Sequence, residues 1–158
     1  MRIEERCRED LMKVLCKRYR EIRQSCDEEL LERVRMQEEY YESFEWFCEL
    51  MQNKDPDTVI ETMVSVSCAT ECILCRIDKA VEDYAEIAKK EGMQSFRQYD
   101  AIYSVYFSNS KSKIRDIAKK YRVRKSTIYD DIKEARNSLT TILFDVSEDI
   151  PSDNFKGE

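Results

Sequence analysis

Two short apolar stripes separated by three residues constrain the fold of this chain more than any other feature. Only Arg122, Val123 and Arg124 lie between them. A joint of three residues forces two short helices to cross steeply, with Val123 at the corner, so we expect a helix-turn-helix. Within each stripe the apolar residues recur at the spacing of an amphipathic helix: Ile114, Ile117, Ala118 and Tyr121 in the first, and Ile128, Ile132, Ala135 and Leu139 in the second.

A helical segment and a polar loop precede these stripes. The segment FRQYDAIYSVYF ends in Tyr106 and Phe107, and SNSK follows it. Together with IAKKYRVRKSTIYDDIKEARNSL, this order resembles the helix-turn-helix of sigma-70 region 4-like proteins, including small phage and prophage transcription regulators of Gram-positive bacteria. The resemblance covers residues 95–143 and implies a three-helix DNA-binding domain over residues 93–143 that acts at promoters, with RNA polymerase as a possible partner.

The turn departs from this family at two positions. Arg122 stands where glycine is usual, so it would have to adopt a positive φ at a cost of about 1 kcal/mol. Arg124 stands where a serine usually caps the second helix. Ser126 or Thr127 could cap it instead, in which case the helix would begin later.

The rest of the chain is also predicted to be helical. Only two glycines and two prolines occur among 158 residues, while 38% of the residues are charged, a composition typical of an all-α protein. No apolar run approaches the length of a membrane span, and MRIEERCRED is too charged for a signal peptide. We therefore expect a cytoplasmic protein without membrane contact.

Residues 1–92 are predicted to form a long antiparallel helical hairpin. Its first helix extends to about Asn53, and Asp55 and Pro56 begin the second, which runs to about Glu91. Gly92 then supplies a left-handed exit residue. The first helix is either one rod or two helices meeting near Cys26, because Ser25 and Glu28 fit a capping box. Such a hairpin has a broad apolar surface, so we expect it to form a homodimer or to bind a partner.

The helix predicted over residues 93–107 should complete the C-terminal domain. We expect it to pack across the two motif helices with one apolar face, formed by Phe96, Tyr99, Ile102, Tyr103 and Tyr106. Residues 144–158 have lost helical periodicity and are predicted to form an acidic, flexible tail. This tail could lie over a basic surface.

The charge of the chain is divided along its length. The net charge is −6 overall, but residues 1–92 carry −8, residues 93–142 carry +6, and residues 143–158 carry −4. Positive charge concentrated on the helix-turn-helix favours double-stranded DNA as the partner. The alternative is that these cations are only the solvated faces of two small helices.

The second motif helix would present its N-terminal residues to base edges in the major groove. The candidates for base contacts are Lys125, Ser126, Tyr129, Asp130 and Lys133. Phosphate contacts would come from the turn and the first helix, with Lys111, Lys113, Lys119, Lys120, Arg122, Arg124 and Thr127 as candidates. Asp130 and Asp131 oppose this hypothesis unless each reads a base, pairs with a cation or faces away.

The seven cysteines are expected to be reduced thiols, since their number is odd and no export signal precedes them. Cys68, Cys72 and Cys75 match the C-x3-C-x2-C spacing of radical-SAM clusters, although a buried helical stripe produces the same spacing. Cys48 would be the fourth ligand of a metal site, because the chain has no histidine. No cofactor and no catalytic activity are expected.

The sequence thus predicts a DNA-binding transcription regulator, and it leaves two alternatives open. One is a helical adaptor or structural protein whose helix-turn-helix docks protein instead of DNA. The other is a cysteine-ligated metal or redox sensor. Steep weakening of DNA binding with salt would distinguish the regulator from the adaptor.

Overall fold

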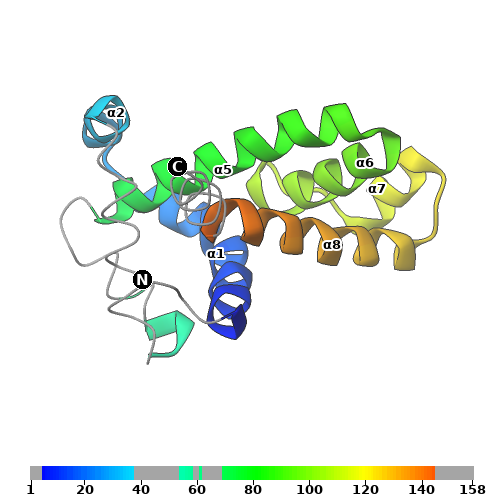
Figure 1. The fold of residues 1–158 in the computed structure, drawn as a ribbon, viewed down its shortest axis with the longest axis horizontal. Helices are drawn as coiled ribbons and strands as arrows, with labels where there is room; N and C mark the ends of the chain where they lie inside the picture. Colours follow the sequence, from blue (N-terminus) through cyan, green and yellow to red (C-terminus); the bar gives the residue numbers. More distant parts are fainter. Residues whose placement is uncertain (1–4, 38–53, 59–60, 62–68, 145–158) are drawn as a thin grey trace, which may run out of the picture. The chain divides into compact units, whose positions relative to one another are not determined.

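The computed structural model describes residues 5–37, 54–58, 61 and 69–144, and every regular element among these residues is a helix (Figure 1). The chain divides into two compact units, residues 1–79 and 80–158. None of the described helices is long and apolar enough to cross a lipid bilayer. In chain order the helices are α1 (Glu5–Ser25), α2 (Glu28–Gln37), α5 (Ala69–Glu91), α6 (Met93–Ile102), the π-helix η1 (Tyr103–Phe107), α7 (Ile114–Tyr121) and α8 (Lys125–Phe144).

The N-terminal helix is interrupted near Cys26, so the possibility of two helices is correct and a single rod is wrong. Asp27 caps α2. Its Oδ1 accepts hydrogen bonds from the backbone N–H groups of Glu29 at 3.0 Å and Leu30 at 3.2 Å. These bonds satisfy two N–H groups that have no partner inside the helix, which fixes the start of α2.

The predicted capping box of Ser25 and Glu28 is wrong. The Ser25 hydroxyl donates instead to the backbone carbonyl of Glu21, one turn back in α1. Serine and aspartate are both good caps, but the chain bends at Cys26, so Asp27 and not Ser25 directly precedes the first turn of α2.

Helices α1, α2 and the first part of α5 supply the core of the first unit. The interruption shifts the buried stripe by one position, because Leu31 is 1% exposed while Leu30 is only half-buried. The buried apolar residues are Leu11, Met12, Leu15, Cys16, Tyr19 and Ile22 of α1, Leu31 and Val34 of α2, and Cys72, Ile73, Leu74, Cys75 and Ile77 of α5.

Polar contacts at both ends of this interface join α1 to α5. Asp78 of α5 accepts hydrogen bonds from the Tyr19 hydroxyl and, at 2.9 Å, from Nη1 of Arg23. Burial and the Asp78 carboxylate raise the pKa of the Tyr19 hydroxyl. The carboxylate of Glu71, near the start of α5, accepts from the backbone N–H of Asp27 at 2.8 Å.

The second half of the predicted hairpin is described only in part. Asp55 caps a helical turn at residues 56–58, as predicted, since its Oδ1 accepts from the Thr58 backbone N–H at 3.1 Å. Residues 38–53, 59–60, 62–68 and 145–158 lie outside the described part of the chain. The hairpin of residues 1–92 and the tail of residues 144–158 therefore stay predictions.

Gly92 separates α5 from α6. Its φ is positive, at 117°, but its ψ of −174° is extended, so it is not the left-handed helical exit residue predicted from the sequence. This combination of angles is essentially restricted to glycine. The Gly92 carbonyl accepts a hydrogen bond from the Phe96 N–H at 3.0 Å, which starts α6 directly after α5 ends.

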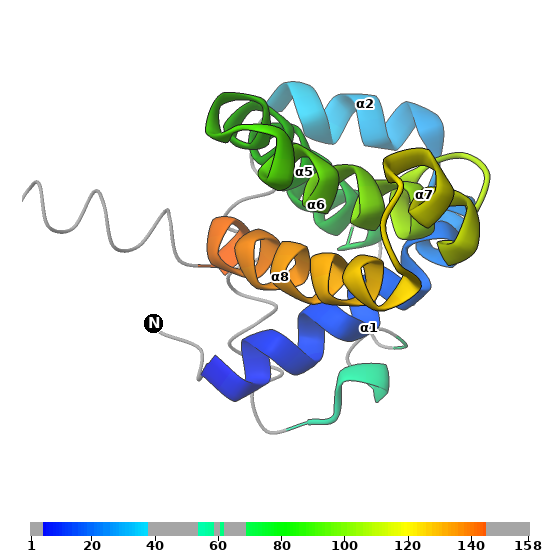
Figure 2. The ribbon, with the colours of Figure 1, turned by 90° about the vertical axis from the view of Figure 1, so that its right-hand side faces the viewer.

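The second unit contains the C-terminal part of α5 together with α6, η1, α7 and α8, and α6 packs closely along α8 (Figure 2). The division between the units falls between Lys79 and Ala80, within α5, whereas the sequence places a boundary at Gly92. The physical reason is that the buried stripe of α5 continues past the division. Ala80 and Tyr84 are buried, and the Tyr84 ring packs edge-on against Tyr99 with centroids 5.6 Å apart.

The apolar face predicted for residues 93–107 is only partly the buried one. Ile102 is 1% exposed, but Phe96 and Tyr103 are 36% and 37% exposed. Their rings flank Tyr99, at centroid distances of 5.9 Å and 5.7 Å, and form a partly exposed aromatic row along α6 and the start of η1. The prediction failed because a polar residue, Arg97, lies on the face of α6 that meets α8.

Candidate functional site

The joint between α7 and α8 has the length and the strained turn residue that the sequence predicts. Arg122 adopts the left-handed conformation, with φ 57° and ψ 44°. The Arg122 and Val123 backbone N–H groups donate to the carbonyls of Lys119 at 3.2 Å and Ala118 at 3.0 Å. These bonds satisfy carbonyls at the end of α7 and turn the chain toward α8.

Helix α8 begins at Lys125, so the later start capped by Ser126 or Thr127 is wrong. The Arg124 carbonyl accepts from the backbone N–H groups of Thr127 at 3.0 Å and Ile128 at 3.3 Å. Arg124 therefore occupies the N-cap position through its backbone. The first turn of α8, from Lys125 to Ile128, is helical, whereas a cap at Ser126 or Thr127 would start the helix after it.

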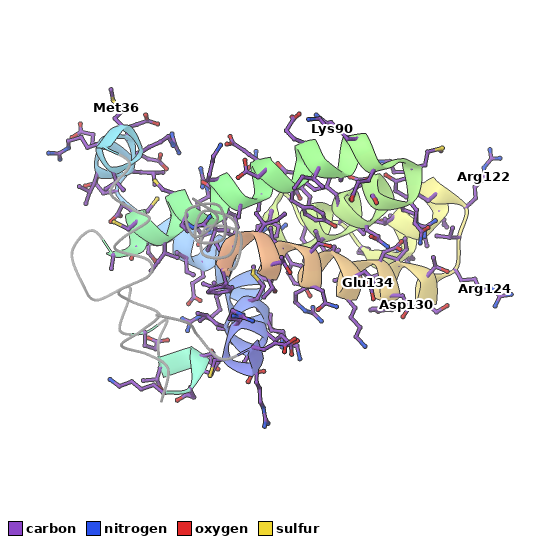
Figure 3. The ribbon with its side chains drawn as sticks, viewed as in Figure 1. Met36, Lys90, Arg122, Arg124, Asp130 and Glu134 are labelled. Atoms are coloured by element: carbon purple, nitrogen blue, oxygen red, sulfur yellow. The ribbon has the colours of Figure 1, made fainter. Side chains whose placement is uncertain are left out.

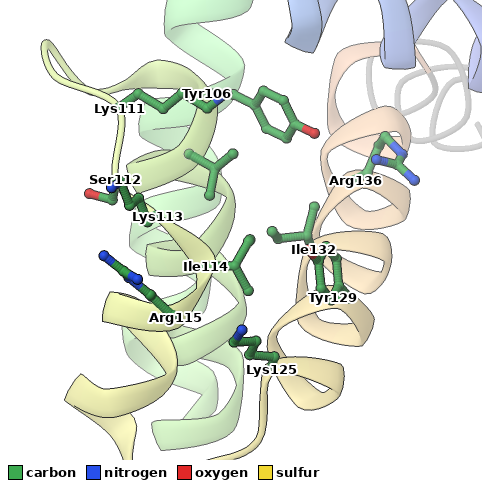
Figure 4. Close-up of a pocket in the computed structure, with 11 residues that line it drawn as sticks. Tyr106, Lys111, Ser112, Lys113, Ile114, Arg115, Lys125, Tyr129, Ile132 and Arg136 are labelled. Atoms are coloured by element: carbon green, nitrogen blue, oxygen red, sulfur yellow. The ribbon is translucent and has the colours of Figure 1, made fainter.

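A groove of about 740 Å³ lies between α8 on one side and η1, the following loop and the start of α7 on the other (Figure 4). Apolar side chains such as Val105 and Ile132 are buried in it, and cations surround them. No acidic residue is among its described lining residues, which are Val105, Tyr106, Lys111, Ser112, Lys113, Ile114, Arg115, Lys125, Tyr129, Ile132 and Arg136.

The α8 side of the groove is a single helical face. Lys125, Tyr129, Ile132 and Arg136 are spaced by four, three and four residues, so they lie one above another on α8. Ile132 is 6% exposed and belongs to the core, whereas Tyr129 is 60% exposed. The face thus combines an apolar base with an exposed aromatic ring, the exposed Lys125 and the half-buried Arg136.

The opposite side is shaped by the π-helix. The Ser108 N–H donates to the Tyr103 carbonyl at 2.8 Å, five residues back, and so closes η1. The Ser112 N–H then donates to the Ser104 carbonyl at 3.0 Å, which folds the loop back along η1. This return places Lys111 and Lys113 at the groove beside the first turn of α7. π-helical turns occur often at functional sites.

The cations of the groove have few carboxylate partners. Within the described part of the chain, Lys111, Lys113, Lys125 and Arg136 have no carboxylate oxygen within 4.0 Å, and Arg115 has only its exposed neighbour Asp116 at 4.0 Å. Exposed lysines and arginines often form ion pairs with nearby carboxylates. Here the positive charge stays available for an anionic ligand.

Two polar contacts from α6 hold α7 and α8 in place behind the groove. The first joins Arg97 to Asp131 of α8, with Nε and Nη2 donating to the two carboxylate oxygens at 2.6 Å and 3.1 Å. The Asp131 side chain is 4% exposed and that of Arg97 is 21% exposed. This two-pronged geometry fixes the rotation of α8 against α6, and it raises the pKa of Arg97.

The second contact joins Asp100 of α6 to the end of α7. Its Oδ2 accepts from Nζ of Lys120 at 2.8 Å and from the Tyr121 hydroxyl, and its Oδ1 accepts from Ser104 at 3.2 Å. Burial opposes ionisation of Asp100, but these donors outweigh it and lower its pKa. Because Arg97 and Asp100 are three residues apart, one face of α6 orients both helices.

All five residues predicted to contact bases lie exposed on α8, but the groove brings only two of them together, Lys125 and Tyr129. Ser126, Asp130 and Lys133 are exposed outside it. The two aspartates that oppose DNA binding have different surroundings. Asp131 is buried against Arg97, whereas Asp130 is exposed.

The residues predicted to contact phosphate are spread more widely. Lys111 and Lys113 line the groove, whereas Lys119, Lys120, Arg122 and Arg124 are exposed elsewhere and Thr127 is half-buried. Arg122 and Arg124 project outward from the turn between α7 and α8 (Figure 3). Lys120 is engaged by Asp100.

Sequence reasoning did not assign four polar or charged groove residues to the site: Tyr106, Ser112, Arg115 and Arg136. A signal for Arg136 was present, because it continues the spacing of Lys125 and Tyr129 along α8. Nothing comparable marked Tyr106, whose position depends on the π-helical turn. Arg115 was overlooked among the many cations of α7.

The metal site suggested by the cysteine spacing is described only in part, and no cluster of three potential ligands occurs among the described residues. Cys72 and Cys75 are buried in α5, and burial raises the pKa of the Cys75 thiol to about 11. Cys48 and Cys68 lie outside the described residues.

Comparison with known proteins identifies no relative. No family model matches the chain, and no curated protein or solved structure is significantly similar to it.

Proposed function

We propose that this chain is a double-stranded-DNA-binding transcription regulator in which α7, the turn and α8 act as a helix-turn-helix. One observation carries the proposal: the groove beside α8 is lined by five cations and by no described acidic residue. DNA binding depends strongly on cations that replace the counterions of the phosphate backbone. The resemblance to sigma-70 region 4-like regulators supports the same function, including contact with RNA polymerase.

In this proposal the exposed N-terminal turns of α8 enter the major groove. Lys125 and Tyr129 reach base edges, because both lie on the exposed side of the helix. Lys111, Lys113 and Arg115 hold the adjacent phosphates and set the orientation of α8. Asp130 either accepts from a cytosine amino group or stays outside the contact.

Replacing Arg124 and Lys125 together with alanine tests this docking. We expect the double variant to lose specific binding by at least about tenfold while its helix content stays unchanged, because both side chains are exposed. DNA selected from a random pool with the wild-type chain supplies the ligand, and fluorescence anisotropy measures its affinity.

The matched control replaces Lys89 and Lys90 of α5 with alanine. Both are exposed, and this substitution removes the same charge as the double variant. This control should bind the selected DNA with nearly wild-type affinity. If both double variants weaken binding equally, or neither does, α8 is not the reading element.

A second candidate function is docking of protein, as a helical adaptor. The observation that favours it is the aromatic row along α6 and the start of η1, where Met93 is 91% exposed and Phe96 and Tyr103 are 36% and 37% exposed. Exposed methionine and aromatic side chains are enriched at protein interfaces. The same surface could serve self-association of a regulator, and light scattering of wild type and Met93→Lys distinguishes a dimer from a monomer.

A further inference from the structure

The groove beside α8 combines two features that together define its ligand. Its inner surface is apolar, with Val105 and Ile132 each 6% exposed. Its edges carry Lys111, Lys113, Arg115, Lys125 and Arg136. A ligand that fills such a groove carries several negative charges interspersed with apolar groups.

Residues 145–158, which directly follow α8, have this chemistry. They contain five acidic residues and one lysine, and apolar residues alternate with the acids in DVSEDIPSDNF. Val146, Ile150 and Phe155 are each next to or near a carboxylate. The segment thus complements the groove in charge and in its apolar spacing.

The distances along the chain also agree. Arg136 lies eight residues before Phe144, and Lys125 lies nineteen before it, so they are about 12 Å and 29 Å from the end of α8 along its axis. An extended chain covers about 3.3 Å per residue. Glu148 and Asp149 can therefore reach back to the level of Arg136, and Asp153 to the level of Lys125.

We propose that residues 145–158 bind in the groove of the same molecule and compete there with DNA. A segment tethered this closely has an effective concentration in the millimolar range, so weak contacts are sufficient for occupancy. Specific DNA displaces it, while nonspecific DNA, which binds more weakly, is partly excluded. This regulatory consequence rests on the proposed function, but occupancy of the groove does not.

Zero-length carbodiimide cross-linking of the full chain without DNA tests occupancy directly. This reagent joins a carboxylate to a lysine amine only where the two are in contact. We expect cross-linked peptides between the acidic residues of 145–158 and the groove lysines, and their loss when salt is raised to 1 M. Mixing isotopically light and heavy protein shows whether the links form within one molecule.

Cross-links confined to lysines outside the groove, such as Lys89 and Lys90, would overturn the proposal. Links found only between light and heavy copies would overturn it as well, because the segment would then occupy the groove of another molecule. Neither result requires DNA, so failure here is distinguishable from failure of the proposed function.

The effect on DNA is measured with a variant that keeps the chain length and removes four charges: Asp145→Asn, Glu148→Gln, Asp149→Asn and Asp153→Asn. We expect it to bind nonspecific duplex DNA at low salt at least about threefold more tightly than wild type. The control removes four exposed acids elsewhere, by Glu5→Gln, Glu9→Gln, Glu82→Gln and Glu91→Gln. An equal gain in both variants would mean that only net charge matters, and the competition would be disproved.

Discussion

Asp130 and Asp131 are adjacent in the sequence and differ entirely in their surroundings. Asp131 is buried and accepts two hydrogen bonds from Arg97, whereas Asp130 is exposed on α8. The sequence alone could state only that each must pair, read a base or face away. Which one pairs depends on the rotation of α8 against α6, and that rotation is a tertiary property.

Asparagine at each position gives a matched pair of variants. Asp131→Asn should lower the free energy of unfolding by about 2 kcal/mol, because it leaves the charged Arg97 without its buried partner. Asp130→Asn should change it by less than about 0.5 kcal/mol. Urea denaturation followed by circular dichroism measures both, and equal effects would show that the pair with Arg97 does not orient α8.

Asp100 gives the second unit a predictable response to acid. Its pKa is lowered below the ordinary 3.8, because donors from Lys120 and Tyr121 outweigh the effect of burial. A lowered carboxyl pKa contributes stability that is present above its unfolded value and is lost as the pH falls through its folded value.

The wild-type chain should therefore lose stability between about pH 5 and pH 2 more steeply than Asp100→Asn, which cannot ionise. The control is Asp116→Asn on α7, since Asp116 is exposed. Thermal unfolding across this range measures the slopes. Parallel curves for wild type and Asp100→Asn would contradict the role of Asp100.

At the scale of elements, the best-predicted part of the chain is α7, the turn and the start of α8. The three- and four-residue spacing of the apolar residues predicts that Ile117, Ala118, Ile128 and Leu139 belong to the core, and all four are buried. Local geometry dominates there, because a joint of three residues leaves few conformations. The positive φ of Arg122 followed from the resemblance, because glycine is usual at that position of the family.

Elements whose ends depend on competing local signals were predicted less well. Ser25 and Asp27 can both cap a helix, and only the position of the turn decides between them. The faces of α6 were assigned by hydrophobicity, although Arg97 lies on the side that meets α8 and Phe96 is exposed. Periodicity identifies a helix but does not tell which of two plausible faces is buried.

The strain at Arg122 can be tested by removing it. Arg122→Gly should stabilise the chain by about 1 kcal/mol, because glycine adopts φ near 57° without the steric cost of a side chain. Arg124→Gly is the control, since Arg124 has no positive φ, and it should give no such gain. A loss of stability in Arg122→Gly would mean that its side chain makes contacts that outweigh the strain.

For the whole molecule, charge is the property that connects sequence to function. The chain is acidic, yet residues 93–142 carry a net charge of +6. Five of these cations gather at one groove. The segregation of charge was evident from the sequence, whereas the groove itself was not, because it needs η1, α7 and α8 brought together.

The central claim, that this groove binds the DNA backbone, is tested most directly by the salt dependence of affinity for duplex DNA. Phosphate contacts from Lys111, Lys113 and Arg115 predict that a plot of log K against log salt has a slope of about −2.7 for the full chain. Replacing Lys113 and Arg115 with alanine should reduce its magnitude by about 1.8. An unchanged slope in that variant, or an affinity in wild type that does not depend on salt, would contradict the account.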